Sequence, residues 1–250
     1  MARFLSESVE IDYEVTGAGP PVLLIHGFAS TARVNWWNTG WVKMLADGGF
    51  KVITFDNRGH GLSTKLYEAE AYRPLTMAGD ARRLLDHLGV DQAHVMGYSM
   101  GARIAALLAI AHPERVRSLV LAGLAASMMT GIDGGEDVAR ALEAPSRDDV
   151  KEPGPLSFRL FAEQTKSDLK ALAACMRSSR EDIPETELAR IAAPVLVVAG
   201  EIDEIAGPVE PLVRAIPDAQ GLTLRDRNHM SAVGDRQFKQ AVIEFFKSNS

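Results

Sequence analysis

Runs of mostly apolar residues alternate with amphipathic stretches along most of this chain. The runs lie at PVLLIHGF (21–28), KVITFD (51–56), AHVMGY (93–98), VRSLVLAG (116–123) and PVLVVAG (194–200), with a weaker one, LTLRD, at 222–226. Such runs are typical of strands buried on both faces of a parallel sheet. Near the amino terminus, apolar residues instead alternate at Val9, Ile11, Tyr13 and Val15. This alternation predicts antiparallel strands at one edge of the sheet.

Helical patterns separate these runs. The expected helices span about residues 36–48, 75–89, 100–112, 210–216 and 235–248. Strands and helices in alternation indicate right-handed crossovers, with helices covering both faces of one sheet. The sequence therefore predicts an α/β fold.

One segment interrupts the alternation. Between residues 125 and 189 there are only short amphipathic pieces, separated by joints that contain Gly and Pro. We expect a helical cap here, lying over the carboxyl edge of the sheet, where open α/β sheets bind ligands. The predicted organisation is a core made of residues 1–124 and 190–250 with a cap insertion at 125–189.

Composition changes this picture mainly by what it excludes. The 250 residues carry a net charge of -6, and Lys and Arg are scattered, so we expect no nucleic-acid partner. The single cysteine, Cys175, excludes an internal disulfide, and acidic residues such as Glu7 and Glu10 occupy the region where a signal peptide would be apolar. No apolar run approaches the roughly 20 residues that span a bilayer. We expect a cytoplasmic protein with no membrane partner.

A serine between two glycines marks the junction of a predicted strand and a predicted helix. The sequence GYSMG at 97–101 places Ser99 where the strand 93–98 ends and the helix 100–112 begins. A nucleophile on such a sharp turn needs small neighbours, because the helix and the strand approach closely. The pattern therefore predicts that Ser99 is a catalytic nucleophile.

A serine hydroxyl needs a base, and the base needs an orienting acid. In this type of sheet the chain order is Ser, acid, His, and only His229 follows Ser99 at a distance beyond its own helix. Asp203 comes directly after the strand 194–200, so it is the favoured acid. Glu204, the next residue, and Asp133, after the preceding strand, are the alternatives.

The oxyanion of an acyl-transfer intermediate needs hydrogen-bond donors. We expect them to be the backbone N–H groups of Met100, directly after the nucleophile, and of Phe28, in the loop after the first long apolar strand. Apolar side chains near the site or in the cap are candidates for the substrate pocket, with core packing as the alternative for each. These candidates are Trp37, Met128, Phe158 and Phe161.

With these residues in place, the chain resembles the α/β-hydrolase superfamily, and within it the esterases and enol-lactonases with a short cap. The matching blocks are HGF (26–28), DNRGHGLS (56–63), GYSMG (97–101), GEID (200–203) and NHM (228–230), and they cover nearly the whole chain in family order. The resemblance implies a mostly parallel eight-stranded sheet flanked by helices, with a small helical cap. A serine rather than an aspartate at position 99 differs from the haloalkane dehalogenases and epoxide hydrolases of the superfamily.

The sequence thus favours a serine hydrolase that cleaves a small to medium ester or lactone with a Ser-His-Asp triad. No cofactor and no metal is expected, since there is no HExxH motif, no pair of cysteines and no complete dinucleotide fingerprint. Two alternatives remain. The first is a hydrolase of C–C bonds in ring-fission products, and the second is a ligand receptor that retains the triad.

Overall fold

The computed structural model describes residues 2–131, 134–178 and 182–250. Within these ranges, eight strands form one sheet in the order β1-β2-β4-β3-β5-β6-β7-β8. Strands β1 and β2 are antiparallel to each other, β2 is antiparallel to β4, and all other neighbours are parallel. The strands are β1 (Ala2–Ser6), β2 (Val9–Thr16), β3 (Pro21–Ile25), β4 (Lys51–Phe55), β5 (Ala93–Tyr98), β6 (Val116–Ala122), β7 (Val195–Gly200) and β8 (Ala219–Leu224). The predicted α/β fold and its antiparallel edge are therefore confirmed.

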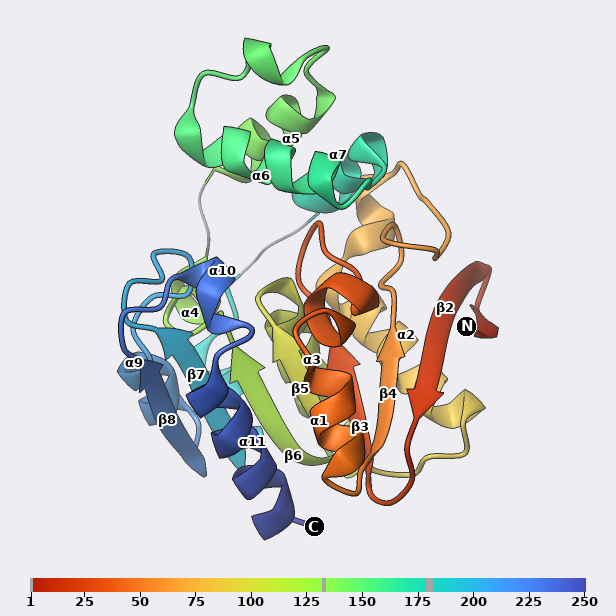
Figure 1. Ribbon diagram of the computed structural model, residues 1–250, viewed down its shortest axis with the longest axis vertical. Helices are drawn as coiled ribbons and strands as arrows, with labels where there is room; N and C mark the ends of the chain where they lie inside the picture. The colour runs from red at the N-terminus through yellow and green to blue at the C-terminus, as the bar shows by residue number, and fades with distance from the viewer. Residues whose placement is uncertain (1, 132–133, 179–181) are drawn as a thin grey trace.

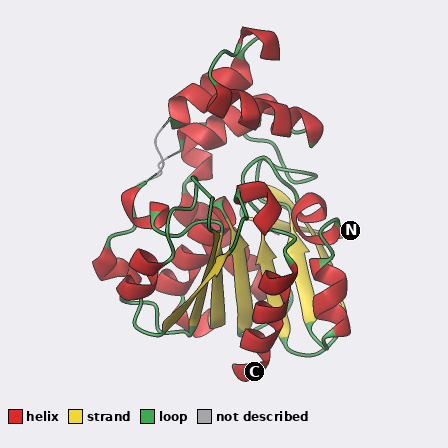
Figure 2. Cartoon of the chain, turned by 60° about the vertical axis from the view of Figure 1, so that its left-hand side comes forward, coloured by secondary structure: helices red, strands yellow, loops and turns green. Residues whose placement is uncertain are grey.

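Helices cover both faces of this sheet. Helices α1 (Trp41–Asp47) and α11 (Arg236–Ser248) lie on one face, in front of the sheet in Figure 1. Helices α2 (Pro74–His87), α3 (Met100–Ala111) and α9 (Glu210–Ala215) lie on the other. In the turned view of Figure 2, helices lie to both sides of the sheet.

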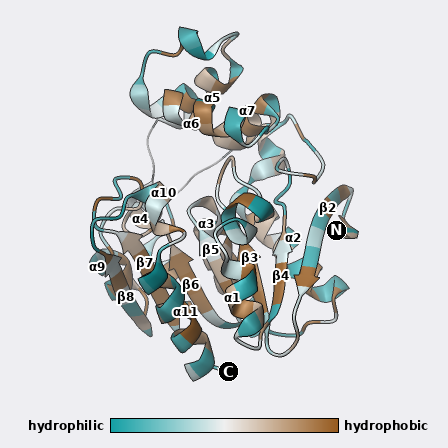
Figure 3. Ribbon diagram, in the orientation of Figure 1, coloured by the Kyte–Doolittle hydropathy of each residue, from teal (hydrophilic) through white to brown (hydrophobic). Residues whose placement is uncertain are grey.

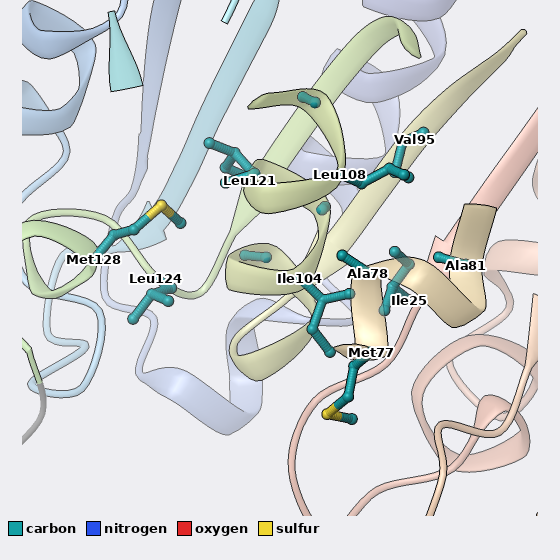
Figure 4. Close-up of a cluster of buried hydrophobic side chains, with 14 of the residues drawn as sticks. Ile25, Met77, Ala78, Ala81, Val95, Ile104, Leu108, Leu121, Leu124 and Met128 are labelled. Atoms are coloured by element: carbon teal, nitrogen blue, oxygen red, sulfur yellow. The ribbon is translucent and has the colours of Figure 1, made fainter. Parts of the chain in front are cut away.

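The two hydrophobic cores follow from the alternation of side chains along the central strands. On β5, Val95 packs towards α2 and α3, whereas Met96 packs towards α1 and α11. The central strands are apolar on both faces and carry the hydrophobic colour of Figure 3. Figure 4 shows part of the first core, in which Ile25 and Val95 from the sheet meet Ile104 and Leu108 from α3.

The predicted helix at 36–48 is wrong in its extent. The structure has a five-residue π-helix (Arg33–Trp37), then a turn at Gly40, and only then α1. Gly40 adopts a φ of 81°, in the left-handed region, so a continuous right-handed helix cannot pass through it. The weak strand predicted at 222–226 is also shifted, because β8 pairs with β7 along Ala219–Leu224.

Between β6 and β7, the described residues form helices and no strand. They are five α-helices and one 3-10 helix: α4 (Ser127–Thr130), α5 (Gly135–Glu143), the 3-10 helix (Arg147–Asp149), α6 (Pro153–Gln164), α7 (Leu169–Arg177) and α8 (Glu185–Leu188). Helix α5 contacts both α6 and α7, and the three helices lie above the carboxyl ends of the strands (Figures 1 and 2). Helix α8 contacts α3 and α9 instead, so it packs with the core. Within the described residues, each helix is too short or too polar to cross a bilayer.

Candidate active site

The turn between β5 and α3 holds Ser99 in a strained conformation. Ser99 has a φ of 56° and a ψ of -118°, a backbone conformation that costs an L-residue roughly 1–3 kcal/mol. The glycines on either side permit it. A Cβ on Gly97 would overlap with the backbone of Gly101, and one on Gly101 would overlap with the carbonyl of Ile25 on β3. The strain is therefore supported by close packing of α3 on two strands.

A hydrogen-bonded chain leads from Ser99 to a buried carboxylate. The Oγ of Ser99 lies 3.1 Å from Nε2 of His229, and Nδ1 of His229 lies 2.9 Å from Oδ2 of Asp203. Because an ionised carboxylate can only accept, Nδ1 carries the proton and Nε2 accepts from the serine hydroxyl. The imidazole is thus oriented as a base towards Ser99.

The Asp203 carboxylate is fixed from its own turn. Its Oδ1 accepts hydrogen bonds from the backbone N–H groups of Ile205, at 3.0 Å, and Ala206, at 2.9 Å. The Asp203 side chain has 0% of its surface exposed, and the His229 side chain 16%. Of the three candidate acids, Asp203 is the one that the structure shows bonded to the imidazole. Glu204 is exposed, and Asp133 lies outside the described residues.

The residue before the serine also holds the histidine, a contact that sequence reasoning missed. The hydroxyl of Tyr98 donates to the backbone carbonyl of His229 at 2.6 Å, and the two rings are 5.5 Å apart. Burial, with a smaller effect from the charge of Asp203, raises the pKa of the Tyr98 hydroxyl, which therefore stays a donor. Helix α10 (His229–Ala232) is fixed from the floor of the site in this way.

A buried histidine orients the loop that carries Phe28. The Nε2 of His26 accepts from the backbone N–H of Asn57 at 2.9 Å, so its Nδ1–H donates to the carbonyl of Gly27 at 2.8 Å. Burial lowers the pKa of His26 to about 4, and the ring remains neutral near neutral pH. The Gly27 N–H donates to Oδ1 of Asn35 at 3.0 Å. Both ends of the Gly27 residue are therefore fixed.

The block at 56–63 supports this loop from below. The two carboxylate oxygens of Asp56 accept from the N–H groups of Ala32 and Leu62, each at 2.8 Å. Arg58 forms a buried bidentate ion pair with Asp80 on α2, with distances of 2.7 and 2.8 Å. These contacts hold backbone and helix in place, and none of them reaches Ser99.

A cavity of about 370 Å³ lies beside Ser99. Its core wall includes Phe28 and Met100, the two residues whose amides were predicted as oxyanion donors. Met100 is the first residue of α3, where backbone N–H groups have no partner within the helix. The other side is formed by residues of α5, α6 and α7, which lie over the cavity.

Of the four predicted pocket residues, only Phe158 is among the described residues that line this cavity. Its ring contacts that of Phe28 edge to face, with centroids 6.0 Å apart. Trp37 lies away from this cavity. The π-helix and the turn at Gly40 place it in the wall of a different cavity, which Asp56 also lines. The expectation for Trp37 is corrected accordingly.

The expectations for the other two pocket residues are corrected as well. Met128 is fully buried in the core below the cavity, next to Leu124 in Figure 4, because α4 packs on the sheet. Phe161, three residues after Phe158 on α6, packs against the same core. Sequence reasoning missed several other lining residues: Tyr72, Met77, Arg103, Ile104, Cys175 and Met176. A periodic pattern can predict a helix, but it does not indicate that a cavity lies beside it.

No group of three or more His, Cys, Asp or Glu side chains in the part of the chain that the structure describes is arranged to hold a metal ion. The groups that the structure brings together at the site are the hydroxyl of Ser99, the imidazole of His229 and the carboxylate of Asp203.

The fold and this hydrogen-bonded chain define a class of protein. Residues 20–181 match the family model for the alpha/beta hydrolase fold, and the chain belongs to that family.

Individual relatives carry different activity names. A curated protein of Mycobacterium tuberculosis, "Putative non-heme bromoperoxidase BpoC", is 28% identical, over 96% of this chain and 98% of its own length. A thermophilic esterase from Thermogutta terrifontis has a TM-score of 0.81 and 24% identity, with all of both chains covered. The enol-lactonase from Burkholderia xenovorans LB400 also has a TM-score of 0.81, with 22% identity, covering 98% of this chain and 100% of its own. These last two likenesses concern the fold.

Proposed function

We propose that this protein is a serine hydrolase that cleaves small to medium carboxylic esters or lactones through an acyl-enzyme on Ser99. One observation carries the proposal: Ser99, on the wall of a cavity, is hydrogen-bonded to His229, which is hydrogen-bonded to Asp203. A cavity of about 370 Å³ suits a small organic substrate rather than a polymer.

In the first half of the reaction, Nε2 of His229 takes the proton of the Ser99 hydroxyl as Oγ attacks the substrate carbonyl carbon. The carbonyl electron pair moves onto oxygen, and the backbone N–H groups of Phe28 and Met100 stabilise that oxyanion. When the tetrahedral intermediate collapses, the bond to the alkoxy group breaks and His229 gives its proton to the leaving oxygen. Asp203 stabilises the imidazolium throughout.

In the second half, water takes the place of the alcohol. His229 removes a proton from the water as its oxygen attacks the acyl carbon, and the same two amides stabilise the second oxyanion. Collapse breaks the bond to Oγ, releases the carboxylic acid and returns the proton to Ser99. For a lactone, the leaving alcohol stays attached to the acyl group, so the product is one hydroxy acid.

The structural neighbours support an ester or lactone as the substrate class only by analogy, since one is named an esterase and another an enol-lactonase. The stronger support is chemical. The hydroxyl, the imidazole and the carboxylate lie in the order and within the distances that acyl transfer requires.

The test is hydrolysis of p-nitrophenyl esters from acetate to laurate. We expect the parent to show a rate that depends on chain length. Ser99→Ala should lower kcat by about 10⁶-fold, and Asp203→Asn by about 10⁴-fold. Glu201→Gln is the matched control, because this exposed carboxylate accepts from the backbone of Asp226 and does not contact His229.

Two results would contradict the proposal. One is full activity of a folded Ser99→Ala protein. The other is a folded parent that leaves every ester intact. If that protein consumes a vinylogous diketone, it cleaves C–C bonds; if it binds a small molecule tightly without turnover, it is a receptor.

A further inference from the structure

The proposed base, His229, lies in a short segment at the surface of the protein. Helix α10 has four residues, and the neighbours of His229 along the chain, Asn228 and Met230, are both exposed. A helix this short has little stability of its own, because its backbone groups all lie near an end. The position of the imidazole therefore depends on contacts between this segment and the sheet.

One such contact comes from the residue that precedes the nucleophile. The hydroxyl of Tyr98 donates to the carbonyl oxygen of His229 at 2.6 Å. In a longer helix this oxygen would accept from the N–H of Val233, but α10 ends at Ala232. The Tyr98 hydroxyl therefore satisfies a carbonyl group at which the helix does not continue.

The tyrosine ring is itself held in place. Tyr98 is the last residue of β5, a central strand of the sheet, and it is 5% exposed. Gly123, directly after β6, leaves room for the ring, since a Cβ on Gly123 would lie 2.7 Å from it. The ring also contacts that of His229, with centroids 5.5 Å apart. A confined ring at the end of a central strand is a rigid support for the histidine.

We propose that Tyr98 is a positioning residue, which holds the base at hydrogen-bonding distance from the nucleophile. Tyr98 and Ser99 are consecutive, and both bond to His229, the first to its backbone and the second to its ring. The end of β5 therefore fixes both partners of the 3.1 Å contact between Ser99 Oγ and His229 Nε2. This inference rests on the function proposed above and adds a residue that does not touch the reacting atoms.

The carboxylate of Asp203 acts on a different part of the histidine. It accepts from Nδ1 at 2.9 Å and so orients the ring, whereas Tyr98 fixes the backbone from which the ring extends. Loss of the Tyr98 hydroxyl should therefore let α10 move relative to Ser99 even with Asp203 in place. A displacement of about 1 Å between reacting groups can lower a rate about 10²-fold.

The kinetic effect should fall on kcat. His229 acts in both halves of the proposed reaction, so acylation and deacylation should both slow. If both slow by similar factors, KM changes little. Tyr98 is also not among the described residues that line the catalytic cavity, so substrate binding should be unaffected.

The experiment compares the parent with Tyr98→Phe, which removes the hydroxyl and keeps the ring. Tyr13→Phe is the matched control, because the Tyr13 hydroxyl lies 3.1 Å from Nε2 of His87, at the antiparallel edge of the sheet. The first measurement gives kcat and KM for p-nitrophenyl acetate. The second is the proton NMR signal of the His229 Nδ1–H, assigned by its absence in His229→Ala. This signal stays sharp only while the hydrogen bond to Asp203 protects the proton from exchange with water.

We expect Tyr98→Phe to lower kcat roughly 10- to 100-fold, to leave KM nearly unchanged and to broaden the Nδ1–H signal. Tyr13→Phe should change none of the three. A Tyr98→Phe protein that unfolds at a lower urea concentration but keeps the parent's kcat and a sharp signal would overturn the inference, because the hydroxyl would then have a structural role alone.

The signal separates this inference from the proposed function, since it needs no turnover. If the folded parent hydrolyses no ester, the proposed function is contradicted, but a signal broadened only in Tyr98→Phe would still support positioning by Tyr98. Equal signals in the parent and both tyrosine variants would overturn it. So would a parent that lacks the signal at low temperature, whether or not Tyr98→Phe folds.

Discussion

The peptide group that joins Gly27 to Phe28, beside Ser99, is oriented by a histidine that is not part of the proposed triad. The Nδ1–H of His26 donates to the carbonyl oxygen of Gly27, and the N–H of Phe28 belongs to the same planar peptide group, pointing the opposite way. Fixing the carbonyl therefore fixes the direction of the proposed oxyanion donor. A second proton on His26 would remove the acceptor that the Asn57 N–H uses, so this arrangement requires a neutral ring.

Three buried histidines predict a loss of stability in mild acid. Burial is the main cause that lowers the pKa of His26 and His94 to about 4, and of His60 to about 3, from an ordinary value of 6.5. The unfolded chain therefore binds more protons below about pH 6.5, and stability is lost as the pH falls through that value towards 4. For His26 alone the loss is about 2 kcal/mol between about pH 7 and about pH 5.

Urea unfolding at about pH 7 and about pH 5 measures this loss. The variant His94→Asn should show a smaller loss than the parent, since one of the three groups is gone. His94 suits this comparison because it packs beside Phe246, on the face of the sheet opposite α3. A parent whose free energy of unfolding is the same at both pH values would contradict this explanation.

At the scale of elements, the strand-turn-helix unit of β5 and α3 depends on the absence of a side chain at Gly101. A Cβ there would overlap with the carbonyl groups of Ile25 and His26, so α3 would have to move away from β3. We expect Gly101→Ala to lower the free energy of unfolding by roughly 1–3 kcal/mol or more, in the range of overpacked cores, and to displace Ser99.

Gly154→Ala is the matched control, because nothing lies within 4 Å of a Cβ on Gly154 and this residue is in the first turn of α6. It should be neutral or stabilising by up to about 1 kcal/mol. Thermal unfolding of the two variants would distinguish them. Equal stability of Gly101→Ala and the parent would mean that the close approach of helix and strand is not required.

The central elements could be predicted because their patterns are strong and their environment is uniform. The run at 93–98 is apolar at nearly every position and became β5, since the centre of a parallel sheet is buried on both faces. The helix predicted at 36–48 failed at Gly40, because sequence periodicity does not report the sign of φ. Ser99, His229 and Asp203 could be placed by chain order, whereas Arg103 and Tyr72 could not. Their role as cavity lining depends on how α5, α6 and α7 pack above them.

At the scale of the whole molecule, the helices above the sheet contact the rest of the protein next to Phe28. The hydroxyl of Thr165, at the end of α6, lies 2.9 Å from the carbonyl oxygen of Ala29, and the rings of Phe28 and Phe158 are in contact. Ala29 itself has a φ of 56°. Helix α6 and the proposed oxyanion loop therefore share contacts, and a change in one should affect the other.

Thr165→Val tests this connection, because it keeps the shape of the side chain and removes the hydroxyl. We expect it to lower the free energy of unfolding by about 1–3 kcal/mol and to speed amide exchange in residues 28–32. Ser157→Ala is the control, since among the described residues its hydroxyl bonds to the carbonyl oxygen of Gly154, within α6. Identical exchange in residues 28–32 for both variants would show that the hydroxyl does not hold the loop.

The most direct test of the central claim is to trap the acyl group. The parent is mixed rapidly with p-nitrophenyl acetate, quenched in acid within the first turnover, digested and analysed by mass spectrometry. The proposed chemistry predicts one acetyl group on the peptide that contains Ser99, a burst of about one p-nitrophenolate per protein molecule, and neither in Ser99→Ala. Steady release of p-nitrophenolate by Ser99→Ala at the parent's rate, or an acetyl group on another residue in place of Ser99, would contradict it.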